Sequence, residues 1–447
     1  MTATSHRAIE TNVPRYTSYP TAPHFHSGVD SSTVEGWITS MPEGEEISLY
    51  LHIPYCDRLC WFCACHTKQT LRYEPVATYL EALKAEIRLF GQLIGSRGRV
   101  SAIHWGGGSP TMLKPLDMKA LRAEIDSSFS LSVDLEFSVE IDPNDMGDDR
   151  LDALAEIGMT RASLGVQDFD PLVQKTINRM QSFELTAGIV NGLRDRGVCS
   201  VNLDLLYGLP HQTLETLGST LDQALSLRPD RIALFGYAHV PWFKKHQTMI
   251  DESALPKGTA RLEQAQTAAA RIARDGYEVI GIDHFALPED SLAIAAREGR
   301  LRRNFQGYTD DRCETLIGLG PSSVSRYRDG YAQNTVSTSE YSRIVQDNSL
   351  AIARGIALTQ DDRIRGWVIE RLMCDFALDT NRLLEQFGPA AKPVLAEAGL
   401  LAQAHDNYGF ERCGDSYIVS DRTLARMVAA HFDPYLAKGN ARHSVAV

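Results

Sequence analysis

Four of the eight cysteines in the chain lie within ten consecutive residues, in the stretch LYLHIPYCDRLCWFCACHT. They are Cys56, Cys60, Cys63 and Cys65. Thiols this close together indicate a metal centre, but structural zinc sites usually collect their ligands from two separated loops. A disulfide is disfavoured in a compartment that keeps thiols reduced. An iron–sulfur cluster suits the spacing better, because each thiolate can bind a different iron.

The spacing C-x3-C-x2-C, from Cys56 through Cys60 to Cys63, would leave one iron of a [4Fe–4S] cluster without a protein ligand. A catalytic metal centre requires such an open position, whereas a structural centre is closed. The sequence therefore predicts a catalytic cluster. The other four cysteines are far apart, and we expect them to be buried structural thiols: Cys199, Cys313, Cys374 and Cys413.

Six short β-rich runs follow one another between residues 48 and 238, with longer helical patterns between them. The runs span 48–54, 100–105, 134–141, 160–166, 200–208 and 231–238. The segment 75–90 is a typical intervening helix, with Pro75 suited to its first turn and apolar residues at helical spacing. Successive strand–helix units imply a parallel sheet with right-handed crossovers. We therefore predict an α/β fold, a partial (β/α)6 barrel.

Polar and glycine-rich residues stand where these strands end. The cysteines follow the first strand, GGGSP (106–110) the second, and Gln167 the fourth, while Glu140 ends the third and Asp204 lies in the fifth. Because active sites of parallel α/β sheets lie at the carboxyl ends of the strands, we expect these residues to meet.

The chain of 447 residues is long enough for one large enzyme domain with smaller additions. We predict an N-terminal arm over 1–47, the barrel over 48–285, a connector over 286–357 that completes the site, and a mostly helical C-terminal domain over 358–447. The pattern at 361–400, followed by a hairpin, leaves a winged DNA-binding module open, although a lid or substrate-side domain fits better without a basic stripe.

The composition excludes several classes of partner. With 43% hydrophobic and 23% charged residues the chain is an ordinary globular protein, and its net charge of −12 disfavours nucleic acid and anionic membranes. The sequence has no apolar run of membrane-spanning length and no secretory signal at MTATSHRAIE. We expect a cytoplasmic enzyme that is a monomer.

The three-cysteine spacing after the first strand of a βα barrel, with Phe62 directly before the third cysteine, resembles the radical S-adenosylmethionine (SAM) superfamily. In that superfamily the amino and carboxylate groups of SAM bind the open iron, and the reduced cluster cleaves SAM to a 5′-deoxyadenosyl radical.

Over nearly its full length the chain is similar to one family within it, the bacterial oxygen-independent coproporphyrinogen III oxidases. The matching segments include RYTSYPTA, HWGGGSPT, GVQDF, NLDLLYGLP, YAHVP, REGRLRRNFQGYT and YAQN. The resemblance implies oxidative decarboxylation of two propionates of coproporphyrinogen III to vinyl groups, giving protoporphyrinogen IX in anaerobic haem biosynthesis. It also implies a [4Fe–4S] cluster, two SAM molecules, an electron donor and an electron acceptor that is not known.

The resemblance assigns residue roles by position. Cys56, Cys60 and Cys63 match the cluster ligands, and Cys65 and Glu140 match catalytic residues. Contacts of the cluster-bound SAM correspond to Tyr50, Gly107, Glu140 and Val324. Contacts of the second SAM correspond to Phe62, Gly108, Ser109, Gln167, Arg179, Asp204 and Ala238. The departures are mild: Ser109 replaces a common threonine and keeps its hydroxyl.

A substrate with four carboxylates calls for cationic anchors, and guanidinium groups pair well with carboxylates. We nominate Arg15 in the arm and Arg302 or Arg303 beside NFQGY. Two other functions remain open: a haem-carrying chaperone of the same superfamily, and a DNA-binding iron–sulfur regulator.

Overall fold

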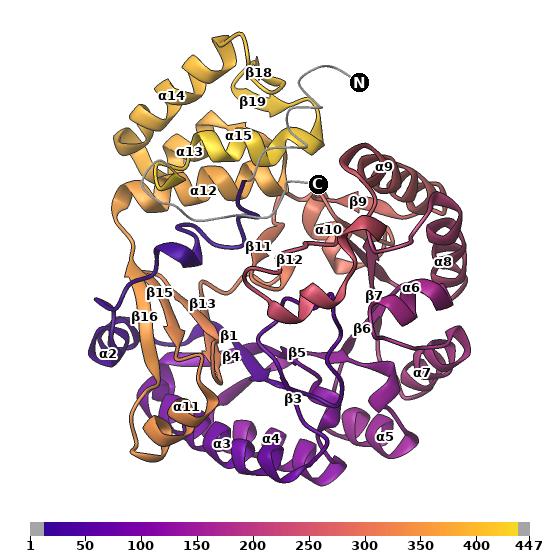
Figure 1. Cartoon of the computed structure of the whole chain (residues 1–447). Helices are drawn as coiled ribbons and strands as arrows, with labels where there is room; N and C mark the ends of the chain where they lie inside the picture. Colours follow the sequence, from indigo (N-terminus) through magenta and orange to yellow (C-terminus); the bar gives the residue numbers. More distant parts are fainter. Residues whose placement is uncertain (1–12, 437–447) are drawn as a thin grey trace.

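The computed structural model describes residues 13–436, which are built around one curved sheet (Figure 1). Its centre is a run of six parallel strands that pair in chain order. These are β1 (Glu45–Ile53), β4 (Gly98–Gly107), β5 (Ser130–Ile141), β6 (Arg161–Gln167), β7 (Ser200–Tyr207) and β8 (Arg231–Gly236). The predicted six-unit partial barrel is confirmed, and strand boundaries differ from the prediction by up to four residues.

The crossover helices cover the outer face of this sheet (Figure 1). They are α3 (Glu74–Ile94), α4 (Pro115–Ser128), α5 (Asp148–Glu156), α6 (Pro171–Thr176), α7 (Phe183–Asp195), α8 (Leu214–Ser226) and α9 (Gly258–Arg274). Helix α3 starts as predicted, with Pro75 in its first turn, and its apolar face is buried: Val76, Tyr79, Leu80, Leu83 and Ile87. Helical spacing places these side chains on the one stripe that faces the sheet.

Strand alternation explains why the barrel interior is polar. In β1, Ile47, Leu49, Leu51 and Ile53 are at most 1% exposed and belong to the main apolar core. The intervening residues of a strand point to the opposite face. The sequence EEISLYLHI therefore packs a hydrophobic face against helices and leaves Ser48, Tyr50 and His52 for the interior of the barrel.

The sheet extends beyond the predicted barrel on both sides and has twelve strands. On the β1 side lie β13 (Thr315–Leu319), parallel to β1, then β14 (Val324–Tyr327), β15 (Gly330–Asn334) and β16 (Ile352–Ala357), which are antiparallel. On the β8 side lie β10 (His284–Ala286) and β9 (Glu278–Ile280). Much of the expected connector is thus barrel wall. The neighbouring helices are α10 (Ser291–Arg297) and α11 (Thr338–Gln346).

The C-terminal region is mostly helical and has its own apolar core. It contains α12 (Gln360–Cys374), α13 (Thr380–Phe387), α14 (Lys392–Gln403) and α15 (Ala425–His431), with a small sheet of β17 (Ala377–Asp379), β18 (Phe410–Cys413) and β19 (Ser416–Val419). Figure 1 places it beside the open part of the barrel, next to the hairpin of β11 (Arg302–Asn304) and β12 (Gly307–Thr309).

The described part of the predicted arm, from residue 13, packs on two parts of the molecule: its beginning packs on this C-terminal region, whereas its later part, with Val34 and Ile38, joins the barrel core beside α3. Tyr16 and Tyr19 join its apolar core, and the Tyr16 hydroxyl donates to Asp433 at 3.1 Å. Arg426 donates to the Val13 and Pro14 carbonyls. The arm then continues into α2 (Ser31–Thr39). Residues 1–12 of the predicted arm and 437–447 of the predicted C-terminal domain lie outside the described residues.

Two further observations bear on the sequence predictions. None of the helices in residues 13–436 is long and apolar enough to cross a membrane. Cys313 and Cys374 are buried as expected, but Cys199 and Cys413 are exposed, so the prediction of four buried structural thiols is wrong for these two. Both stand beside a turn, where the chain has no partner layer to cover a side chain.

Candidate active site

A cavity of about 800 Å³ occupies the barrel interior. Its wall consists of inward-pointing residues from successive strands, among them Tyr50, His104, Glu140 and Asp204. Val324 at the start of β14 closes it on one side. The carboxyl ends of the strands thus meet at one cavity, as parallel topology predicts.

The cysteine-rich loop follows β1 and rests on the cavity. It includes the short strands β2 (Tyr55–Cys56) and β3 (Lys68–Gln69). Distant side chains hold its backbone carbonyls: Asn178 binds that of Leu59 at 2.9 Å, and Gln247 binds that of Phe62 at 2.8 Å. His246 holds the Cys63 carbonyl at 2.7 Å. Side chains from distant parts of the fold therefore help to fix the loop conformation.

The three thiols proposed as cluster ligands lie near one another. Burial raises the pKa of Cys56, and the nearby Cys63 and Cys60 raise it further. Burial also raises the pKa of Cys60, against the opposing charge of Arg179, whose Nη1 lies 3.6 Å from the Cys60 sulfur. Buried thiolates that repel one another need a cation to stabilise them. The three residues therefore fit an iron–sulfur cluster, which supplies that positive charge at three separate irons.

Cys65 differs from these three, because it is exposed and lines the cavity. Its amide donates to the Cys63 sulfur at 3.4 Å. A thiol–thiol hydrogen bond between the two raises the pKa of Cys65 and lowers that of Cys63. In the described part of the chain, no three His, Cys, Asp or Glu side chains are grouped closely enough to hold a single metal ion.

Glu140 stands at the centre of a polar chain in the cavity wall. It accepts hydrogen bonds from His104 Nε2 and from the Gly107 amide, both at 3.1 Å. Although burial works to raise the pKa of Glu140, these bonds outweigh it and lower the pKa. The Tyr50 ring stacks on His104 with ring centres 5.7 Å apart. Glu140 is thus held ionised and presents an acceptor to the cavity.

His52 connects this wall to the cysteine loop. Burial lowers its pKa to about 4, so the ring is neutral at pH 7. Its Nδ1 accepts from the Tyr50 hydroxyl at 3.0 Å, and its Nε2 donates to the His66 carbonyl at 2.9 Å. The neutral ring has one donor and one acceptor, so these two partners fix its tautomer.

The glycines of GGGSP allow the β4 end to pass close to the cysteine loop. A Cβ on Gly107, where φ is +112°, would lie 2.5 Å from His52 Nδ1, and one on Gly108 would lie 2.5 Å from the Tyr55 carbonyl oxygen. Amides of Gly108 and Ser109 instead donate to the loop carbonyls of Ile53 and Tyr55. Only glycine fits positions this close to another backbone.

Gln167 and Arg179 have unusual local geometry. Gln167 has φ of +70° at an irregularity that ends β6, a conformation that non-glycine residues adopt uncommonly. Arg179 is 7% exposed and forms an ion pair with Asp142 at 2.9 Å. Its Nε is buried without a hydrogen-bond partner among residues 13–436. The described residues thus leave this donor unsatisfied.

The predicted site residues fall into two groups. Those lining the cavity are Tyr50, Cys65, Gly107, Glu140, Asp204 and Val324, together with the nominated Arg15, Arg302 and Arg303. Those outside its lining are Cys56, Cys60, Phe62, Cys63, Gly108, Ser109, Gln167, Arg179 and Ala238. Ser109 is 2% exposed and its hydroxyl donates to Asp145, while the Ala238 carbonyl shares Gln247 with Phe62.

Sequence reasoning missed His52, His104 and Asp283, which line the same cavity. The alternation of β1 and β4 carried a signal for the two histidines, because each shares a face with Tyr50 or Gly106. No local pattern marks Asp283, which enters the cavity beside the β9–β10 hairpin.

Comparison with known proteins agrees with this geometry. The radical SAM superfamily model matches residues 50–224. Oxygen-independent coproporphyrinogen III oxidases from Paracoccus denitrificans and Bradyrhizobium diazoefficiens are 46% and 45% identical, each over 98% of this chain, and cover 97% and 98% of their own lengths. The structure of coproporphyrinogen III oxidase from Escherichia coli, described as a radical SAM enzyme, aligns with a TM-score of 0.90 at 38% identity, over 95% of this chain and all of that one.

The partial barrel and the three-cysteine loop, with these matches, define a radical SAM enzyme, which uses a [4Fe–4S] cluster and SAM. Within that superfamily, the chain belongs to the family of oxygen-independent coproporphyrinogen III oxidases.

Proposed function

We propose that this chain converts two propionate side chains of coproporphyrinogen III to vinyl groups and so forms protoporphyrinogen IX in anaerobic porphyrin biosynthesis. The observation that carries the proposal is 46% identity over 98% of the chain to an oxidase of that name. In each conversion the propionate loses a hydrogen atom from its β-carbon, carbon dioxide and one electron.

We propose that Cys56, Cys60 and Cys63 hold the cluster and that SAM binds in the adjoining cavity. When bound together, the cluster and SAM supply a 5′-deoxyadenosyl radical as the hydrogen-abstracting group. Tyr50, Gly107, Glu140 and Val324 all line the cavity beside the cysteine loop, which supports their assignment to the cluster-bound SAM. Glu140 suits this role because an ionised carboxylate accepts hydrogen bonds from hydroxyl or ammonium groups.

A second SAM molecule is part of the same proposal. It would contact Phe62, Gly108, Ser109, Gln167, Arg179, Asp204 and Ala238. The Arg179 Nε, which has no hydrogen-bond partner among residues 13–436, would donate to its carboxylate. Asp204 lines the cavity and would accept from ribose hydroxyls.

We assign Cys65 and Glu140 to the catalytic residues. Cys65 reaches the cavity from the cysteine loop, so its thiol can contact a substrate without being a cluster ligand. The cavity lies inside the barrel, whose wall would limit the access of water to a radical that reacts with it. We further propose a cytoplasmic monomer without nucleic-acid or membrane partners, reduced by a separate electron donor.

An anaerobic assay tests the function. Reconstituted protein with reductant, SAM and coproporphyrinogen III should yield 5′-deoxyadenosine and the divinyl product together. Cys63→Ser should lose the cluster absorbance, whereas Cys65→Ser should keep it and lose the product. Retention of haem without any decarboxylation would instead favour the chaperone alternative.

A further inference from the structure

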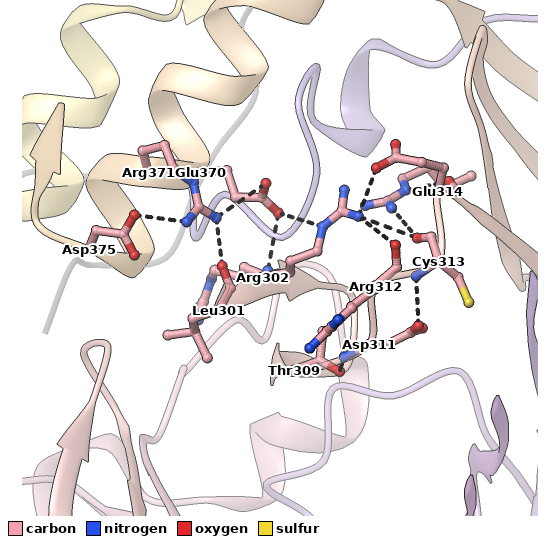
Figure 2. A network of polar contacts seen from close by, with 12 residues as sticks. Leu301, Arg302, Thr309, Asp311, Arg312, Cys313, Glu314, Glu370, Arg371 and Asp375 are labelled. Atoms are coloured by element: carbon pink, nitrogen blue, oxygen red, sulfur yellow. Dashed lines mark hydrogen bonds and ion pairs between the residues drawn. The ribbon is translucent and has the colours of Figure 1, made fainter. Parts of the chain in front are cut away.

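Two consecutive arginines of strand β11 have opposite surroundings. Figure 2 shows Arg302 inside a closed network between β13 and helix α12. Its guanidinium lies 2.9 Å from Glu314 and 3.7 Å from Glu370, and it also donates to the Arg312 carbonyl. The protein itself therefore satisfies Arg302, which removes this residue from our nominated substrate anchors.

Arg303 points to the other side of the strand, into the cavity. Its side chain is only 6% exposed, yet Nη1 is buried without a hydrogen-bond partner in residues 13–436. The nearest carboxylate oxygen recorded for it belongs to Asp283 at 3.8 Å, beyond hydrogen-bonding reach. Its guanidinium lies over the Tyr308 ring at 4.3 Å, and Nε donates to the Arg15 carbonyl at 3.2 Å. A buried donor without an acceptor is costly unless a ligand completes it.

Arg15 brings a second guanidinium to the same place. It is exposed, lines the cavity and, among residues 13–436, donates only to the Gly236 carbonyl, at 3.3 Å. No carboxylate of residues 13–436 forms an ion pair with it. Arg303 holds its backbone from one side, and Arg426 holds the preceding Val13 and Pro14 from the other. The arm is thus fixed with Arg15 over the cavity.

The charges at this end of the cavity favour an additional anion. Although burial would raise the pKa of Asp283, the charge of Arg303, the hydrogen bond from His284 and the charge of Arg15 hold it well below its usual range. Asp283 is therefore ionised and compensates one of the two guanidiniums. The pKa of Arg426 is lowered to about 10 by burial and by the charges of Arg15 and Arg303.

The cavity also contains Arg161 and Arg231, and Arg161 likewise has buried nitrogens, Nε and Nη1, without a hydrogen-bond partner in residues 13–436, but both arginines have a carboxylate at close range. Arg161 pairs with Glu136 at 2.9 Å, and Arg231 pairs with Asp290 at 2.7 Å and with Asp310 at 3.6 Å. Carboxylates outnumber guanidiniums there, so an incoming carboxylate would be repelled.

We propose that Arg15 and Arg303 together bind one propionate carboxylate of the macrocycle, one that is not undergoing reaction. The inference rests on the proposed function and adds where the substrate is anchored. A substrate with four carboxylates, enclosed in a cavity lined by Glu140, Asp204 and Asp283, needs a fixed cationic contact. That contact sets which propionate faces the cysteine loop. Arg15 and Arg303 are positioning residues for the reaction.

Binding of coproporphyrin III, the fluorescent oxidised macrocycle with the same four propionates, tests the proposal on the reconstituted holoenzyme. Arg15→Ala and Arg303→Gln should each raise its dissociation constant roughly 10- to 100-fold, as expected for one lost charge-assisted contact. Arg15→Lys should recover part of the affinity. Arg343→Ala, which removes an arginine with 68% of its side chain exposed on α11, is the matched control.

Turnover gives a second readout. Loss of an anchor should raise KM for coproporphyrinogen III by a similar factor, while SAM affinity stays within about twofold. Arg15 is exposed, so Arg15→Ala gives a clear answer even if Arg303→Gln misfolds. An unchanged dissociation constant and KM in Arg15→Ala would overturn the inference while wild-type turnover upheld the function. Failure of the wild-type enzyme to decarboxylate would instead reject the proposed function.

Discussion

Replacing Gly107 by alanine tests how closely the fold and the site depend on one glycine. Its φ of +112° lies outside the range that alanine adopts easily, and its new Cβ would lie 2.5 Å from His52 Nδ1 and 2.6 Å from Cε1. The histidine ring must move to make room. His52 has two hydrogen-bond partners to lose, the Tyr50 hydroxyl and the His66 carbonyl.

The magnitude follows from these contacts. A left-handed alanine costs about 1 kcal/mol, and each lost buried hydrogen bond costs about 1 kcal/mol more. Gly107→Ala should therefore reduce the free energy of unfolding by at least about 3 kcal/mol. Gly197 is the matched control: its φ is +84°, but no atom lies within 4 Å of its added Cβ. Gly197→Ala should cost only about 1 kcal/mol.

Urea unfolding followed by tryptophan fluorescence measures the stability of both variants, and isothermal titration measures SAM binding. Gly107→Ala should also weaken SAM at least roughly tenfold, because Tyr50 and the Gly107 amide both line the proposed SAM site. Equal stability and equal SAM affinity in the two variants would show that the close approach of Gly107 to His52 does not organise the site.

Two buried carboxylates, Glu86 and Asp204, predict that folding stability and SAM affinity depend on pH. Burial raises the pKa of Glu86 from 4.5 to about 7, so between these values the folded chain keeps a proton that the unfolded chain has lost. Stability should then fall by about 3 kcal/mol as pH rises across that interval, and Glu86→Gln should remove this part of the slope in urea unfolding; identical slopes would contradict it. Desolvation, then the charge of Glu140, raises the pKa of Asp204 to about 6, so SAM affinity should increase from pH 5 to 7.5 as the carboxylate ionises. Asp204→Asn should show no such increase in equilibrium dialysis, and a parallel increase would exclude Asp204 as the titrating contact.

Local patterns in the sequence were sufficient for the parallel barrel and for the position of the cysteine loop. Strand alternation and helical periodicity are properties of neighbouring residues, so β1 and α3 could be placed from EEISLYLHI and its following helix. The edge strands β13–β16 could not, because what recruits them is pairing of β13 with β1, across more than two hundred residues. The exposure of Cys199 and Cys413 likewise depends on which layer covers each turn.

The cysteine loop likewise combines a feature that the local sequence predicts with contacts that it does not. Spacing alone identified Cys56, Cys60 and Cys63, but the side chains that hold their loop come from positions 178, 246 and 247, beyond β6 and β8. Each of these donates to a backbone carbonyl, a contact that requires a particular position and leaves no residue pattern in the loop itself.

The choice between the two arginines of β11 as a substrate anchor also depends on contacts distant in the sequence. Adjacent residues of a strand face opposite sides, so Arg302 and Arg303 meet different neighbours although both line the cavity. The sequence alone gives no basis for choosing between them, because the choice depends on Glu314, which lies 2.9 Å from the Arg302 guanidinium. Among residues 13–436, no carboxylate lies within hydrogen-bonding distance of the Arg303 guanidinium. The residue directly before β13 thereby engages Arg302 and leaves the guanidinium of Arg303 available, and so contributes to substrate placement without providing a catalytic group.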